Sequence, residues 1–115
     1  MSFDFDSSQL DAVTGGDSDF EREVLETFLD SAPRDVARVC AALTTNDGQT
    51  ASAAAHALKG AGAAIGGRGL AAAAKAVEQA AKAGEFDAAP ALVGRLRCEF
   101  DELSAYLRTR IARAA

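Results

Sequence analysis

Residues 91–112, ALVGRLRCEFDELSAYLRTRIA, give the clearest indication of the fold. The large apolar residues of this stretch recur in steps of four and three, which is the spacing that places side chains on one face of an α-helix. We expect this helix to begin near Asp87, to tolerate Pro90 in its first turn and to run to about Ala112. Its apolar stripe consists of Leu92, Leu96, Phe100, Leu103, Leu107 and Ile111.

The same helical period extends towards the N-terminus. A short helix is expected from about Ser8 to Thr14, and a long one follows it, capped by Asp17 or Ser18. Pro33 interrupts the stripe of the long helix without resetting its phase, which predicts a kink or a tight break there. That stripe consists of Phe20, Val24, Phe28, Ala32, Val36, Val39 and Leu43.

Two shorter helices are expected between these long ones. Residues 45–48 read as a turn and a helix cap, a third helix runs from about Gln49 to Ile65, and a fourth from about Arg68 to Lys82, closed by Gly84. Short connections between amphipathic helices make neighbouring helices antiparallel. The sequence therefore predicts one all-α domain over residues 1–115, an up-down antiparallel four-helix bundle with an additional short N-terminal helix.

Composition excludes several classes of protein. Cys40 and Cys98 lack metal or redox spacing, so we interpret both as small core residues in a reducing compartment. No leader and no membrane-spanning run is found, which predicts a cytoplasmic protein without a membrane partner. Residues 1–30 carry nine acids and one base, which argues against nucleic acid as a partner. Those acids most simply form a solvated helix face.

His56 is the one histidine of the chain, and helical phase predicts where it points. Stepping by threes and fours from Leu58 gives the expected core face of its helix. At about 100° per residue, His56 lies roughly 200° from Leu58, so it faces solvent or a partner. The core face itself comprises Ala51, Ala54, Ala55, Leu58, Gly62 and Ile65.

The neighbours of His56 on its own face are small, apart from the cationic Lys59. Gly60 is the informative one, because a glycine inside a helix costs about 1 kcal/mol relative to alanine and no packing within the bundle requires it there. We interpret it as room for a partner that comes close to the backbone. Helical geometry places on this face Ser52, Ala53, Lys59, Gly60 and Ala63.

An exposed imidazole beside an ammonium group suits phosphoryl transfer. The imidazole nitrogen can attack a phosphoryl group, and the ammonium stabilises the charge on its oxygens. From geometry alone, however, an ordinary surface histidine and a reactive one both remain open.

The string His56-Ala57-Leu58-Lys59-Gly60, followed by small residues and Ile65-Gly66, resembles the signature of the histidine phosphotransfer (HPt) domain. The resemblance covers nearly the whole chain. It extends to Gly15-Gly16-Asp17, Phe20, Phe28-Leu29, Pro33, Leu70, Ala74, Val77-Glu78, Phe100 and Leu103. In the pattern of this family, a serine often follows the Lys-Gly pair and an aromatic residue often begins the histidine helix. This chain has Ala61 and Gly48-Gln49 there.

The resemblance implies a definite function. His56 would accept a phosphoryl group from the aspartyl phosphate of a receiver domain and pass it to another receiver aspartate, with Lys59 stabilising its charge and Gly60 admitting the receiver's loops. The implied partners are receiver domains of a hybrid histidine kinase or a response regulator. The family also implies phosphorylation at Nε2. The required Mg²⁺ would belong to the receiver, so no cofactor or metal is expected on this chain, which we expect to be a monomer.

Other functions fit these residues less well. An autophosphorylating kinase dimerisation domain usually has an acid directly after its histidine, whereas Ala57 stands here, and no phosphate-binding glycine loop is present. We therefore expect no autokinase activity. A metal- or haem-binding bundle lacks ligands. A non-catalytic helical adaptor with a degenerate HPt fold remains the alternative.

Overall fold

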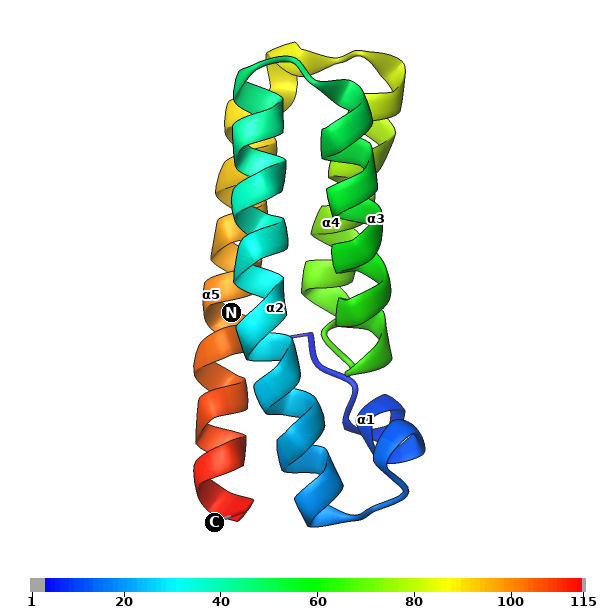
Figure 1. The fold of residues 1–115 in the computed structure, drawn as a ribbon, viewed down its shortest axis with the longest axis vertical. Coiled ribbons are helices and arrows are strands. Elements are labelled where there is room, and N and C mark those ends of the chain that lie inside the picture. The colour runs from blue at the N-terminus through cyan, green and yellow to red at the C-terminus, as the bar shows by residue number, and fades with distance from the viewer. Residues whose placement is uncertain (1–3, 115) are drawn as a thin grey trace.

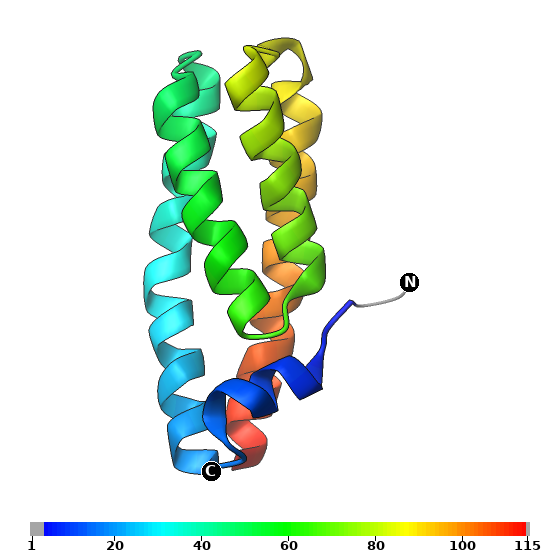
Figure 2. The ribbon, with the colours of Figure 1, turned by 90° about the vertical axis from the view of Figure 1, so that its right-hand side faces the viewer.

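The computed structural model describes residues 4–114 and is a bundle of helices (Figures 1 and 2). Four long helices run alternately up and down, and a short helix lies beside one end of them. This confirms the predicted fold class. The helices are α1 (Ser7–Thr14), α2 (Ser18–Thr44), α3 (Gly48–Ala64), α4 (Arg68–Ala83) and α5 (Ala89–Ala114), with a 3₁₀ turn, η1 (Phe86–Ala88), before α5.

The helix ends form where the sequence places capping residues. Asp6, Asp17 and Asp47 each stand at a helix N-terminus, and their side chains accept hydrogen bonds from backbone N–H groups of the first turn. Gly84 ends α4 in the left-handed conformation, with φ of 72°. The predicted boundaries are thereby confirmed to within one or two residues.

Pro33 does not end α2, so the expectation of a tight break is wrong. The helix runs without interruption from Ser18 to Thr44 and retains the apolar stripe on both sides of the proline. A proline removes one backbone hydrogen bond. Core packing compensates for this loss, because apolar residues before the proline (Phe28 and Ala32) and after it (Val36) are buried in the core.

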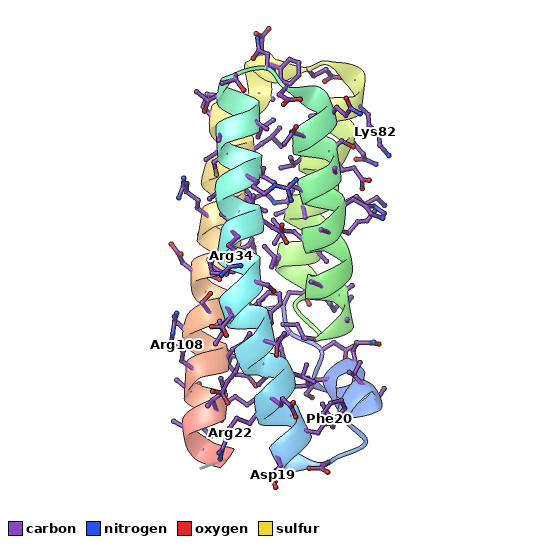
Figure 3. The ribbon with its side chains drawn as sticks, in the orientation of Figure 1. Asp19, Phe20, Arg22, Arg34, Lys82 and Arg108 are labelled. Carbon is purple, nitrogen blue, oxygen red and sulfur yellow. The ribbon has the colours of Figure 1, made fainter. Side chains whose placement is uncertain are left out.

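The core follows the predicted stripes with two exceptions. Phe20 is 43% exposed, because it lies in the first turn of α2, beyond the ends of α3 and α4 (Figure 3). Cys98 is also exposed, whereas Cys40 is buried. Cys98 stands two residues from both Leu96 and Phe100, which places it about 200° around the helix from each of them. Its interpretation as a core residue is wrong.

The two long helices extend past the two short ones. Figure 1 shows α2 and α5 continuing below the turn between α3 and α4, with α1 beside this extension. Arg110 of α5 joins the two extensions, since its Nε and Nη2 both donate to the carboxylate of Glu21 on α2 at 3.0 Å. The N-terminal segment crosses to the α3–α4 turn, where Asp6 N–H donates to Gly66 O at 2.7 Å. No helix among residues 4–114 has the length and apolar character needed to cross a bilayer.

Candidate functional site

His56 lies midway along α3 and points out of the bundle. Its side chain is 69% exposed, whereas Leu58, two residues further on, is fully buried. The buried face of α3 consists of the residues predicted for it, so the outward orientation deduced from helical phase is confirmed.

A shallow hollow of about 580 Å³ opens beside His56, between α3 and α4. Ser52 and Ala53 line it from α3, as their predicted place on the histidine face requires. Its other lining residues are Gly48, Gln49, Glu78 and Lys82. The hollow therefore lies on the side of His56 that faces the N-terminus of α3.

Gly60 and Ala63 lie on the other side of His56. A Cβ atom built on Gly60 would meet no atom within 4 Å, so nothing inside the molecule requires a glycine there. Ala63 borders a separate hollow near the α3–α4 turn, together with Gly66 and Arg68. The predicted partner-binding residues thus occupy one long face, but the structure does not gather them into one pocket.

The carboxylate of Glu78 on α4 connects the groups around His56. Its side chain is only 8% exposed, and its Oε2 lies 3.0 Å from His56 Nδ1. Lys59 Nζ donates to Oε1 at 2.7 Å, and Lys82 Nζ lies 3.3 Å from Oε2. A single carboxylate therefore holds one imidazole and two ammonium groups.

These contacts keep Glu78 ionised. The hydrogen bond from Lys59, followed by those from Lys82 and His56, lowers the pKa of Glu78 to about 2, against the opposite effect of its burial. At neutral pH the carboxylate is therefore an acceptor only.

The contact with Glu78 determines which imidazole nitrogen can react. When the ring is neutral, its proton resides on Nδ1, because an ionised carboxylate can only accept a hydrogen bond. The lone pair then lies on Nε2, the nitrogen further from α4. A side chain that is 69% exposed presents this atom to a partner, which gives the arrangement of an oriented nucleophile.

Small residues let α3 and α4 approach closely enough for this contact. A Cβ atom on Gly48 would lie 2.8 Å from the backbone oxygen of Ala81 and 3.3 Å from the Phe86 ring. One on Gly62 would lie 3.4 Å from the backbone oxygen of Gly67. A larger residue at Gly48 would force the helices apart, which gives a physical reason for a glycine rather than an aromatic residue at the start of this helix.

The predicted site omitted Glu78 and Lys82, although the sequence contains a signal for both. Glu78 follows Ala74 by four residues and precedes Ala81 by three, so it belongs to the buried side of α4. A carboxylate in such a position needs cationic partners. Lys82, one turn further on, is one of them, and Lys59 of α3 is the other.

Residues 4–114 contain no group of three or more His, Cys, Asp or Glu side chains arranged to hold an ion. Glu78 itself already contacts Lys59, Lys82 and the His56 imidazole.

The chain belongs to the Hpt domain family, whose family model matches residues 23–106. The match includes the whole site, from His56 and Lys59 to Glu78 and Lys82. Membership of this family makes the protein a histidine-containing phosphotransfer protein of two-component signalling.

A solved structure resembles this fold over almost its full length. The crystal structure of histidine-containing phosphotransfer protein B (HptB) from Pseudomonas aeruginosa PAO1 is 26% identical in sequence, with a TM-score of 0.90 over 98% of each chain. No protein with a curated description matches the sequence.

Proposed function

We propose that His56 accepts a phosphoryl group from the aspartyl phosphate of one receiver domain and passes it to an aspartate of another. The observation that carries the proposal is the exposed imidazole whose Nδ1 is held by the buried carboxylate of Glu78. This contact directs the lone pair of Nε2 outwards, in a chain of the Hpt domain family. The protein would act in the cytoplasm as a monomer.

Each transfer is an in-line displacement at phosphorus. The Nε2 lone pair forms the N–P bond while the P–O bond to the donor aspartate breaks, and its electrons leave with the aspartate carboxylate. The proton on Nδ1 stays on the ring and continues to be shared with Glu78. In the second transfer, the carboxylate oxygen of another receiver attacks phosphorus, and the N–P bond breaks with its electrons returning to Nε2 as the lone pair.

Lys59 supplies positive charge to the transferring group. Its Nζ, which donates to Glu78, belongs to a side chain that is one third exposed, so the ammonium can also meet phosphoryl oxygens arriving at His56. The charge that spreads over these oxygens in the transition state is stabilised by such a cation. Mg²⁺ would be held by the receiver, and this chain would need no cofactor.

The face around Nε2 would admit the receiver's loops. Ser52 and Ala53 line the hollow on one side of His56, and Gly60 leaves open space on the other. Ala63 continues this small-residue face towards the α3–α4 turn. We therefore assign the four residues to the contact with the partner.

Incubation with a ³²P-labelled phospho-receiver tests the proposal, with wild type and His56→Gln compared. We expect label on the wild type that is stable in base, labile in acid and absent from the variant. Gln79→Ala, an exposed position on α4, serves as the matched control and should be labelled normally. Failure of every receiver domain of the same organism to label a folded wild-type protein would instead support the non-catalytic adaptor.

A further inference from the structure

Charge is unevenly divided between the parts of this acidic protein. Residues 1–47 carry eleven acids and three bases. Helices α3 and α4 together carry four bases and a single acid, Glu78. The two helices that form the phosphotransfer site therefore carry a net charge of +3, compared with +2 on α5, in a chain whose net charge is −5.

Three of these bases form a line along α4. Arg68, Lys75 and Lys82 recur every seven residues, which is two helical turns and about 10.5 Å per step. We call these three residues the basic ridge. Figure 2 views the molecule from the side on which α3 and α4 face the viewer.

The basic ridge borders the groove between α3 and α4. Lys82 lines the hollow that contains His56, and Arg68 lines the hollow that contains Ala63. The side chains of both are 65% exposed, and Lys75 between them is exposed as well. The ridge thus runs beside the histidine along the same open face.

The charge of the basic ridge is only partly neutralised within the molecule. Arg68 Nε lies 3.6 Å from Asp4 Oδ1, and Lys82 shares Glu78 with Lys59. Within residues 4–114, Lys75 lies in no ion pair found in the structure. It therefore contributes an unpaired positive charge at the middle of the ridge.

We propose that the basic ridge is an electrostatic docking surface for the acidic active-site face of a receiver domain. This inference rests on the proposed function. Proteins hold Mg²⁺ with carboxylates, so a receiver that holds the ion beside its acceptor aspartate presents negative charge there. The ridge, of opposite charge, flanks the histidine that must reach this aspartate. Lys75 guides the encounter from outside the reacting groups, whereas Lys59 acts on the phosphoryl group itself.

The consequence is a salt-dependent rate of association. Complementary charges at the rim of an interface raise the association rate, and the effect fades as ions screen it. Acids over residues 1–47 repel an acidic partner, so the same charge distribution also disfavours docking on α1 and α2.

Rapid-quench measurement of transfer from a ³²P-labelled phospho-receiver tests the ridge, with Lys75→Glu compared with Arg108→Glu. Both substitutions change the net charge equally at exposed positions, but Figure 3 shows Arg108 on α5, at the side opposite Lys82. In low salt, we expect Lys75→Glu to lower the second-order rate constant about 3- to 10-fold. The rate at saturating receiver should stay unchanged, and the difference should vanish near 0.5 M salt.

Arg108→Glu should leave the second-order rate constant within about 1.5-fold of wild type, because it lies outside the ridge. Equal losses from both variants, or a loss from Lys75→Glu that salt does not relieve, would overturn the proposal. If the wild-type protein alone forms a dimer in sedimentation, and salt dissociates this dimer, the ridge binds the acidic face of a second copy of the chain. That result would contradict docking of a receiver.

Failure of the proposed phosphotransfer function can be distinguished from failure of the docking proposal. If no receiver labels His56, the phosphotransfer proposal fails. The ridge is then judged by binding of the unphosphorylated receivers to wild type, Lys75→Glu and Arg108→Glu. Normal labelling with no difference between the variants overturns the ridge alone, and absence of both labelling and binding overturns both proposals.

Discussion

The short pair of helices, α3 and α4, and the long pair, α2 and α5, are built from different residues for different tasks. Each short helix contains eight alanines, in 17 and 16 residues respectively. The long helices bury larger side chains, among them Leu25, Phe28, Leu96 and Leu107. The long pair supplies most of the large apolar side chains of the core, and the short pair supplies the close approach that the site needs.

This difference explains how one carboxylate reaches an imidazole and two ammonium groups across two helices. Glu78 contacts both His56 and Lys59 of α3 because the small alanine and glycine residues between α3 and α4 allow a short distance between the two helices. Bulky residues on these surfaces would add apolar burial and move the helices apart. Substitutions in the two pairs should therefore separate stability from phosphotransfer.

Truncation in the long pair should have the largest effect on stability. Leu96 of α5 is fully buried, so Leu96→Ala should lower the free energy of unfolding by about 2–5 kcal/mol. Transfer by the fraction that remains folded should continue at the normal rate. Chemical denaturation and transfer assays at low temperature measure the two quantities. Arg108→Ala, exposed on the same helix, should change stability by less than about 0.5 kcal/mol.

Enlargement of a residue in the short pair should damage the site more than the fold. Ala74 of α4 is fully buried, and Ala74→Leu should lower the free energy of unfolding by about 1–3 kcal/mol. Because the added atoms push α4 outwards, Glu78 should lose His56 and transfer should slow. The exposed Ala72→Leu is the matched control and should change neither. Normal transfer by Ala74→Leu would contradict the link between close packing and site geometry.

The ion pairs of the short pair should appear in the pH dependence of stability. The pKa of Glu78 is about 2 in the folded chain and near 4.5 when unfolded, so its contribution is complete above the unfolded value. It should be lost progressively as the pH falls from about 5 to 2. Glu78→Gln should therefore lose less stability than wild type over this range. Denaturation curves at several pH values measure the difference; parallel curves would show that the three cations do not stabilise the carboxylate.

Among the site and core positions tested, Gly60 should show the smallest change in stability, and substitution there should increase stability. Because the space around it is open, Gly60→Ala should raise the free energy of unfolding by about 0.5–1 kcal/mol. Gly60→Gln should keep its helicity in circular dichroism and block transfer. Gly94→Ala, in equally open space on α5, should give a similar gain without affecting transfer. Normal phosphoryl transfer by Gly60→Gln would show that the partner does not need the open space at Gly60.

Helical period predicted most of the fold, because burial in a bundle repeats with the period of the helix. It placed Leu58 inside and His56 outside correctly, since the angle between two residues of one helix depends only on their spacing. It failed at Phe20, whose burial depends on where the neighbouring helices end. That boundary is a property of the assembled bundle, which no single stripe contains.

The site could be predicted only where it depends on a single helix. The sequence placed His56, Lys59 and Gly60 on one face because they belong to one helix. The contacts of Glu78 cross from α4 to α3, and they depend on the relative height and rotation of two helices. Only the position of an acid on a buried stripe indicated that a partner was needed.

The alanine content of α3 and α4 has a consequence for the entropy of docking. A long side chain loses up to about 2 kcal/mol of rotamer entropy when it is fixed, whereas alanine loses none. Around His56, the partner would meet mostly methyl groups and backbone, with Gln49, Lys59 and Lys82 as the long side chains to be ordered. A surface of this kind has few side chains left to order, so even brief encounters can form the complex at a small entropic cost.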